Sequence, residues 1–166
     1  SADKLILPGV GAFPDAMALL GESGLASEIE TECKNGKPLL GICLGMQLLF
    51  EKSYEFGCTD GLGLIPGEVI PIDGHGLKIP HIGWNSLSLL NPSDTLVKGM
   101  KDGEYVYFVH SYRADTDKQN TVCSTFYGEE IPALVKSPSL NVWGAQFHPE
   151  KSHDTGLALL KRFAEQ

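Results

Sequence analysis

Pro38-Leu39-Leu40-Gly41-Ile42-Cys43-Leu44-Gly45-Met46-Gln47 is the stretch that carries the main structural signal of this sequence. The apolar run up to Ile42 predicts a buried strand that ends at Cys43, and the pattern from Met46 to Lys52 predicts a helix directly after it. A cysteine between two glycines at such a junction has the context of a nucleophile elbow in which Cys replaces Ser. Gly fits both flanks because a Cβ would clash in so tight a turn. The helix N-terminus is also expected to lower the thiol pKa. The alternative is a buried core cysteine beside packing glycines.

The segments around this junction predict the fold class. In the first half, strand-like runs alternate with helical stretches, which favours parallel strands joined by crossover helices. Dense Gly and Pro between Ser53 and Pro92 predict short strands, loops and an antiparallel addition. Residues 1–166 are therefore predicted to form a single α/β domain, with an open, mostly parallel sheet flanked by helices and an added antiparallel portion. The expected strands cover residues 5–7, 38–42, 104–112, 122–126, 133–136 and 142–147, and the expected helices cover residues 15–20, 27–34 and 154–164.

Composition, net charge and cysteine spacing exclude several classes of protein and of binding partner. The chain has 166 residues, of which 42% are hydrophobic and 20% are charged, and this excludes a disordered or fibrous protein. Thirteen Lys and Arg against 21 Asp and Glu leave a net charge of -8, so the sequence predicts neither a nucleic-acid nor a membrane partner. Four cysteines without C-x-x-C spacing weaken the case for a zinc site or a disulfide scaffold. We expect a cytoplasmic protein without metal or cofactor; its cysteines are Cys33, Cys43, Cys58 and Cys123.

A cysteine nucleophile needs a base and an acid that orients the base. His148-Pro149-Glu150 supplies both at the end of a predicted strand, with a spacing that lets Glu150 turn back toward the imidazole. Taken singly, His148 is more often a surface or capping histidine, and Glu150 a helix first-turn charge. Their occurrence together with the elbow favours a Cys-His-Glu triad.

Attack on an amide creates an oxyanion that needs two backbone N–H donors. Leu44 supplies one donor from the elbow. Pro8-Gly9-Val10-Gly11 follows a predicted strand and supplies a second N–H, because its glycines leave the backbone open to approach. The alternative is a plain turn between a strand and a helix.

Residues 41–47 and 147–150 together resemble the class I glutamine amidotransferases, which use this triad. Within that group, residues 8–11, 80–85 and 107–112 are similar to the glutaminase subunits of imidazole glycerol phosphate synthases, enzymes of histidine biosynthesis. The resemblance implies hydrolysis of glutamine to glutamate and ammonia through a Cys43 thioester, and it implies hydrolase and lyase as enzyme classes. It also implies a heterodimer with a (β/α)8-barrel cyclase subunit that receives the ammonia.

The resemblance also assigns roles residue by residue. Cys43 is the nucleophile, His148 the base and Glu150 its orienting partner, while Gly9, Val10 and Leu44 form the oxyanion site. Trp84 and Asn85 match the face that docks on the cyclase subunit. The alternative for Trp84 is an ordinary buried side chain beside a turn. The residues expected to hold the glutamine substrate are Gly11, Gln47, Glu55, His110, Ser111 and Tyr112.

Members of this family begin with about 40 more residues, the length of one βαβ unit, ahead of the strand that leads to Gly9. We therefore expect the N-terminal βαβ unit to be missing from the chain as given. Two other functions stay open at this point. One is the glutaminase of another amidotransferase, such as anthranilate or aminodeoxychorismate synthase, and the other is a catalytically silent interaction subunit.

Overall fold

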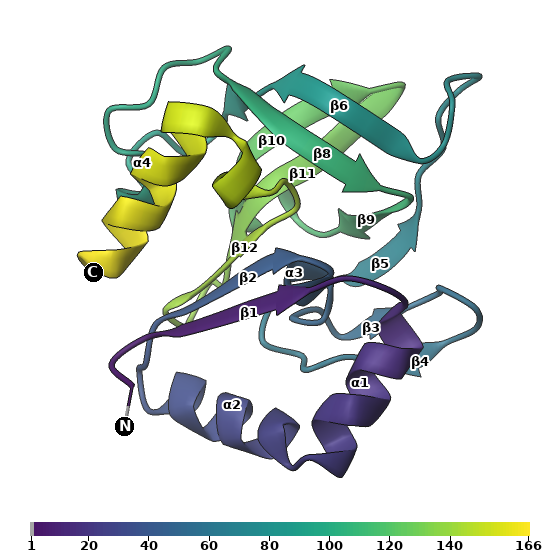
Figure 1. Ribbon diagram of the computed structural model, residues 1–166, viewed down its shortest axis with the longest axis vertical. Coiled ribbons are helices and arrows are strands. Elements are labelled where there is room, and N and C mark those ends of the chain that lie inside the picture. Colours follow the sequence, from purple (N-terminus) through teal and green to yellow (C-terminus); the bar gives the residue numbers. More distant parts are fainter. Residues whose placement is uncertain (1) are drawn as a thin grey trace.

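The first half of the chain builds the parallel edge of the central sheet. The computed structural model describes residues 2–166. Its first elements are β1 (Leu5–Gly9), α1 (Phe13–Glu22), α2 (Leu25–Lys34), β2 (Leu39–Cys43) and α3 (Leu44–Gln47). β1 and β2 are parallel, in a register that places Gly9 opposite Cys43. Figure 1 shows α1 and α2 beneath these two strands.

The second half of the chain, from β3 onward, consists mainly of strands, and those between Ser53 and Pro92 are short, as the density of Gly and Pro there predicts. Only α4 is a long helix among the described residues of this half. The elements are β3 (Lys52–Ser53), β4 (Thr59–Asp60), β5 (Glu68–Pro71), β6 (His81–Ser86), β7 (Ser88–Leu89), η1 (Thr95–Val97), β8 (Tyr105–His110), β9 (Tyr112–Asp115), η2 (Lys118–Asn120), β10 (Thr121–Tyr127), β11 (Glu129–Lys136), β12 (Val142–Ala145), η3 (Pro149–Lys151) and α4 (His153–Ala164).

The central sheet has the strand order β1-β2-β12-β11-β10-β7. β1, β2 and β12 are parallel neighbours, whereas β11, β10 and β7 continue the sheet antiparallel. The other strands form two smaller sheets, with the orders β4-β3-β5-β9 and β6-β8. The predicted α/β class, with parallel strands, flanking helices and an antiparallel addition, is confirmed.

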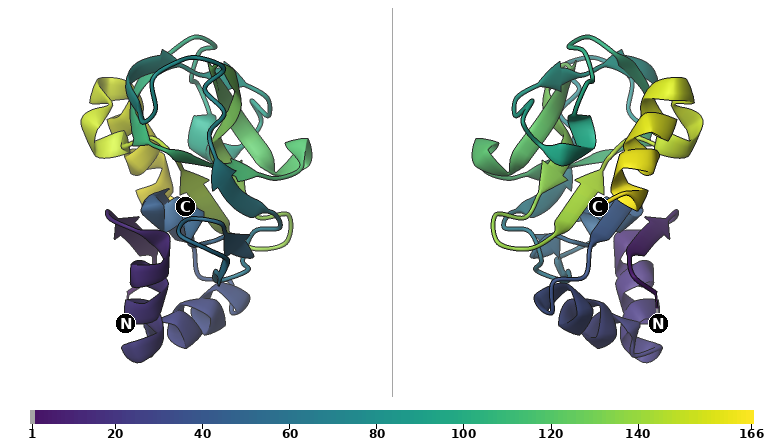
Figure 2. Two further views of the ribbon diagram at one scale, coloured as in Figure 1. Left: turned by 90° about the vertical axis from the view of Figure 1, so that its right-hand side faces the viewer. Right: turned by 90° about the vertical axis from the view of Figure 1, so that its left-hand side faces the viewer.

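Both faces of the parallel strands β2 and β12 are buried, whereas the edge strand β1 exposes Ile6. Leu40 and Trp143 pack with Phe163 of α4 on one face. Leu39 and Val142 pack on the other face with Phe13 at the start of α1. Figure 2 shows α4 on one side of the sheet and α1 and α2 toward the opposite end of the molecule. Burial on both faces explains why β2 has a continuous apolar sequence instead of an alternating one.

The helix after Cys43 is much shorter than predicted. α3 ends at Gln47, and the expected helical residues up to Lys52 form turns followed by the start of β3. The carbonyls of residues 48–50 accept hydrogen bonds from the backbone N–H groups of residues 62–65. Because those carbonyls pair with a loop, they cannot accept from amides one helical turn further on. The correction therefore comes from a tertiary contact.

The α-helices of residues 2–166 include none with the length and apolarity that a membrane crossing requires. All four cysteines are free thiols, and Cys33 and Cys123 are buried.

Candidate active site

The elbow around Cys43 has the predicted tight geometry. Cys43 has φ +54° and ψ -112°, a conformation that is rare for a residue with a side chain. A Cβ on Gly41 would lie 2.6 Å from the Gly45 carbonyl oxygen, and a Cβ on Gly45 would lie 1.7 Å from the Leu7 carbonyl oxygen. Glycine is therefore required at both flanks, for the steric reason expected from the sequence.

A cavity of about 350 Å³ opens at this elbow. Its wall joins six separate parts of the chain: the loop after β1, the elbow, the loop after β3, the segment just before β6, the β8–β9 junction and the segment that follows β12. Pro80 and Val109, which the sequence did not single out, also line it. The predicted site residues that line it are Val10, Gly11, Cys43, Leu44, Gln47, Glu55, His110, Ser111, Tyr112 and His148.

His148 and Glu150 form the expected pair. His148 Nδ1 lies 2.8 Å from Glu150 Oε1; the imidazole is buried, while the Glu150 side chain is 48% exposed. The segment is attached to β8, because the His148 N–H donates to the Tyr107 carbonyl and the Tyr107 N–H donates to Ser152 Oγ. Because β12 lies beside β2, residue 148 reaches the same sheet edge as Cys43. The ring is thereby held at the cavity with its Nδ1 occupied.

The electrostatics at Cys43 differ from the sequence-based prediction. Burial raises the pKa of the Cys43 thiol, and the nearby Glu150 charge raises it further, whereas the Leu44 N–H and Lys151 oppose this. The thiol lies 3.8 Å from the Val109 carbonyl oxygen, which can accept its proton in a hydrogen bond. Burial is the largest effect on the thiol, and the Leu44 N–H at the start of α3 lowers the pKa in the predicted direction. Because desolvation outweighs this N–H, the net shift is upward, which the sequence did not predict.

The two glycines after β1 have different roles. A Cβ on Gly9 would lie 3.2 Å from the Gly45 backbone nitrogen, so Gly9 allows β1 to approach the elbow. Gly11 has φ +98°, and no atom lies within 4 Å of the position that a Cβ would occupy. Glycine is therefore favoured at position 11 by its backbone conformation and not by a close contact. Val10, between them, is 87% exposed and lines the cavity. Gly9 and Glu150 line a second cavity that shares Val10 and His148 with the first.

Three of the expected glutamine-holding residues, Gln47, His110 and Tyr112, are connected by hydrogen bonds. Gln47 Nε2 donates to the Tyr112 carbonyl and to Gln146 Oε1, both at 3.1 Å. His110 Nδ1 lies 2.8 Å from the same Tyr112 carbonyl. Glu55 Oε2 accepts from the Phe13 N–H at the start of α1 at 2.8 Å, so this carboxylate also caps a helix.

Trp84 and Asn85 lie on the β6–β8 ribbon and do not line the cavity. Trp84 is 42% exposed, which excludes the alternative of an ordinary buried tryptophan. Its ring stacks on His153 at 4.8 Å. Asn85 Nδ2 donates to the Phe126 carbonyl. The exposed apolar side chains of this ribbon and of adjacent β10 are Ile82, Trp84, Tyr105 and Phe126.

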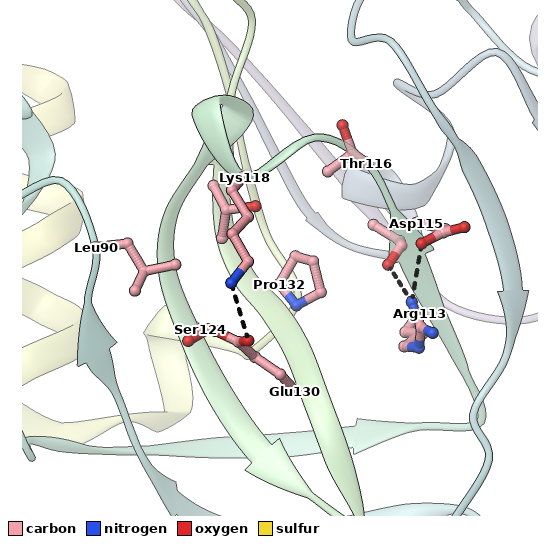
Figure 3. A pocket seen from close by; sticks show the side chains of 10 residues that line it. Leu90, Arg113, Asp115, Thr116, Lys118, Ser124, Glu130 and Pro132 are labelled. Atoms are coloured by element: carbon pink, nitrogen blue, oxygen red, sulfur yellow. Dashed lines mark hydrogen bonds and ion pairs between the residues drawn. The ribbon is translucent and has the colours of Figure 1, made fainter.

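Another cavity, of about 170 Å³, lies at β9, β10 and β11 (Figure 3) and contains none of the predicted site residues. Its cations are paired: Arg113 contacts Asp115 and Glu129, and Lys118 contacts Glu130. Across residues 2–166, His, Cys, Asp and Glu side chains form no group of three or more that could hold a metal ion.

Three residues that sequence reasoning did not assign to the site support it in the structure. Gln146 is fully buried and holds the Gln47 amide, Val109 presents its carbonyl to Cys43, and His81 hydrogen-bonds to His110. Gln146 lies two residues before His148, and this proximity was the available signal. For Val109 the sequence offers none, because a backbone carbonyl is independent of residue type.

The glutamine amidotransferase class-I family model matches residues 2–166. The chain belongs to this family. Among curated class-I relatives, imidazole glycerol phosphate synthase subunit HisH of Caldanaerobacter subterraneus subsp. tengcongensis is 54% identical over 98% of this chain and 79% of its own length. The subunit of the same name from Wolinella succinogenes is 52% identical, over 98% and 80%.

Among solved structures, PurLQS from Thermotoga maritima superposes with a TM-score of 0.73 at 24% identity, covering 98% of this chain and 79% of that one. This likeness supports the fold. A class-I glutamine amidotransferase releases ammonia by hydrolysis, so the predicted lyase class does not describe this chain.

Proposed function

We propose that this chain is the glutaminase subunit of an imidazole glycerol phosphate synthase in histidine biosynthesis. The observation that carries the proposal is the cavity in which Cys43 and His148 meet Val10 and Leu44 of the expected oxyanion site and the expected glutamine-holding residues. The relatives in two organisms, at 52–54% identity, carry that synthase's name. We further infer that residues 1–166 act as one amidotransferase domain.

In the proposed reaction, Cys43 attacks the side-chain carboxamide carbon of glutamine. His148 removes the thiol proton, which activates a sulfur that burial otherwise keeps protonated. His148 then returns this proton to the departing nitrogen, and ammonia leaves as the C–N bond breaks. Water, deprotonated by His148, cleaves the γ-glutamyl thioester to give glutamate and the free thiol.

Glu150 and the backbone support these steps. Because Glu150 occupies Nδ1, it orients the ring so that Nε2 is the working nitrogen, and it stabilises the imidazolium that forms. The N–H groups of Leu44 and Val10 are the proposed donors to the oxyanion. Each such donor is typically worth about 100- to 1000-fold in turnover.

The glutamine head group is proposed to lie along Tyr112, Ser111 and Gln47. Both hydrogen bonds of the Gln47 amide nitrogen go to protein acceptors, so its Oε1 is the atom left to accept from the substrate. Glu55 lines the same cavity and supplies a carboxylate for the substrate's ammonium group.

The β6–β8 ribbon around Trp84 and Asn85 is the proposed docking face for a (β/α)8-barrel cyclase subunit. Its exposed aromatic side chains have the composition of an interface core. Ammonia would pass to that subunit within a heterodimer. Neither nucleic acid nor a membrane is part of the proposed function, and we place it in the cytoplasm.

A glutamine analogue with an electrophilic carbon at the amide position tests the chemistry. In the complex with the cyclase subunit we expect one covalent adduct, located at Cys43 by mass spectrometry, together with loss of glutamate release. An unlabelled chain would favour a silent interaction subunit. Normal labelling, but no production of imidazole glycerol phosphate with the cyclase subunit, would favour another amidotransferase.

A further inference from the structure

A chain of side-chain hydrogen bonds crosses the interior from the β6 edge to the cavity. Asn85 Oδ1 lies 2.9 Å from His81 Nε2, His81 Nδ1 lies 2.9 Å from His110 Nε2, and His110 Nδ1 lies 2.8 Å from the Tyr112 carbonyl oxygen. We call these four groups the histidine relay. His81 is fully buried, stacked between Phe108 and Tyr127. The relay ends at the same carbonyl that holds the Gln47 amide.

Both ends of the relay are hydrogen-bond acceptors. The Tyr112 carbonyl can only accept, so His110 Nδ1 must carry a proton. At the other end, Asn85 Nδ2 donates to the Phe126 carbonyl, and this contact identifies the atom facing His81 as the oxygen. His81 Nε2 must therefore carry a proton if this end is to be a hydrogen bond.

When both rings are neutral, the relay has one proton fewer than its three contacts need. Two neutral imidazoles carry two N–H groups, whereas the three contacts need three. If both ends are satisfied, two bare nitrogens of His81 and His110 face each other at 2.9 Å. A third proton would make every contact a hydrogen bond but would leave a cation in the interior.

Burial decides against that cation at neutral pH. Desolvation lowers the pKa of both rings, that of His110 to about 4, and a positive His148 would lower the pKa of His110 further. The other titratable group against the pair is the Tyr127 phenol, and within residues 2–166 neither ring forms an ion pair with a carboxylate. One contact of the neutral relay must therefore be unsatisfied.

The Asn85 end is where the unsatisfied contact costs least. His81 and His110 are both buried, so a bare nitrogen between them has no access to water. At the other end the bare nitrogen is His81 Nε2, which is buried too, but it faces the half-buried Asn85 on the outer ribbon, whose amide can turn and can hydrogen-bond to water or to a bound partner. The neutral relay therefore keeps both inner hydrogen bonds, with a proton on Nδ1 of each ring.

We propose that His81 is a positioning residue for the glutamine site. We also propose that its contact with Asn85 is the one contact of the relay that lacks a hydrogen bond. His81 donates to His110, and His110 holds the Tyr112 carbonyl that in turn orients Gln47. A partner group that donates to the Phe126 carbonyl or otherwise frees the Asn85 amide lets it turn, donate Nδ2 to His81 Nε2 and close the relay without a proton. This last step rests on the proposed function, since it places Asn85 at the docking face.

Nitrogen NMR of the ¹⁵N-histidine-labelled chain, alone and in complex with the cyclase subunit, tests the relay directly. At pH 7.5 we expect both rings to be neutral with the proton on Nδ1, and acidification should add one proton to the pair before a second. Asn85→Asp should raise the proton affinity of the pair at least tenfold, because a carboxylate favours His81 Nε2–H, whereas the matched Asn85→Leu should not. A proton on His81 Nε2 at pH 7.5, or no increase in Asn85→Asp, would overturn the proposal.

Steady-state kinetics of the complex test positioning. His81→Phe keeps the stacking between Phe108 and Tyr127 but removes both ring nitrogens. We expect the KM for glutamine to rise about tenfold while ammonia-dependent synthesis stays at the wild-type rate, which reports an intact fold and interface. An unchanged KM would refute the positioning role. A wild-type complex that releases no glutamate would refute the proposed function instead. The tautomers of His81 and His110 measured by NMR would still test the proton positions proposed for the relay.

Discussion

Gly45→Ala is the substitution whose structural effect, a displacement of β1 from the elbow, can be worked out most directly from distances in the structure. The new Cβ would lie 1.7 Å from the Leu7 carbonyl oxygen, whereas real contacts of this kind stay at or above 3.0 Å. β1 and α3 must therefore separate by at least 1.3 Å. Within the described residues β1 pairs with β2 alone, so it is the element that gives way.

The displacement acts on the oxyanion segment because Gly9 and Val10 directly continue the moved strand. A misplacement of about 1 Å typically costs about 100-fold in rate, and overpacking costs about 1–3 kcal/mol of stability. We therefore expect glutamine hydrolysis by the complex to fall about 100-fold, with a lower midpoint in urea unfolding. Ammonia-dependent synthesis should be retained, because β1 lies outside the proposed docking face on the β6–β8 ribbon.

Gly21→Ala is the matched control. Gly21 lies in α1 with no atom within 4 Å of a new Cβ, so the same substitution should leave the rate unchanged and stabilise the helix by about 0.5–1 kcal/mol. A Gly45→Ala protein with the wild-type rate and unfolding midpoint would refute the steric account of the elbow.

Four further predictions concern the nucleophile, the interface and activation. Cys43→Ala should abolish glutamine-dependent synthesis but keep ammonia-dependent synthesis, measured as imidazole glycerol phosphate formed; loss of both would contradict the nucleophile assignment. Because burial raises the Cys43 pKa, alkylation of this thiol by iodoacetamide should accelerate about tenfold per pH unit and still be rising at pH 9; a plateau near neutral pH would mean a lowered pKa. Trp84→Ala should weaken cyclase binding at least about tenfold in calorimetry, as loss of an exposed aromatic anchor does, and unchanged affinity would remove Trp84 from the interface. We also infer that the peptide before Val10 turns its N–H to the oxyanion only when the cyclase subunit binds, since the flanking glycines permit such a change; the free chain should then hydrolyse glutamine about 100- to 1000-fold more slowly than the complex, the cost of one oxyanion donor, and equal high rates would exclude this activation.

Local sterics made the elbow predictable. Glycine at 41 and 45 around Cys43 has one dominant explanation, a turn too tight for a Cβ, and the structure has the close contacts that this explanation requires. The pair His148 and Glu150 was predictable for the same reason, since a two-residue spacing through proline limits where the carboxylate can lie. The contact of Gly41 with Gly45 and the pairing of His148 with Glu150 join residues close in the sequence, whereas the residue that Gly45 meets, Leu7 of β1, is supplied by the tertiary structure.

The resemblance to known amidotransferases supplied residues that local patterns do not reveal. Glu55 comes from a segment with little pattern of its own, and the strand pattern around Ser111 and Tyr112 does not by itself indicate a substrate contact, yet all three line the cavity with Cys43. What their side chains contact was not predicted. The bond from Glu55 to the Phe13 N–H joins residues 42 positions apart.

Only the tertiary structure decided the length of α3, the direction of the Cys43 pKa shift and the histidine relay. α3 stops at Gln47 because the carbonyls of the next residues, 48–50, pair with the backbone N–H groups of residues 62–65. The thiol pKa is raised because several distant segments exclude water around it. The contact of Gln47 with Gln146 spans 99 residues and exists because β12 pairs with β2. The sequence determined the conformations governed by sterics along the chain. Hydrogen-bond partners and desolvation depend on which distant segments meet, and the packing of the sheet settled them.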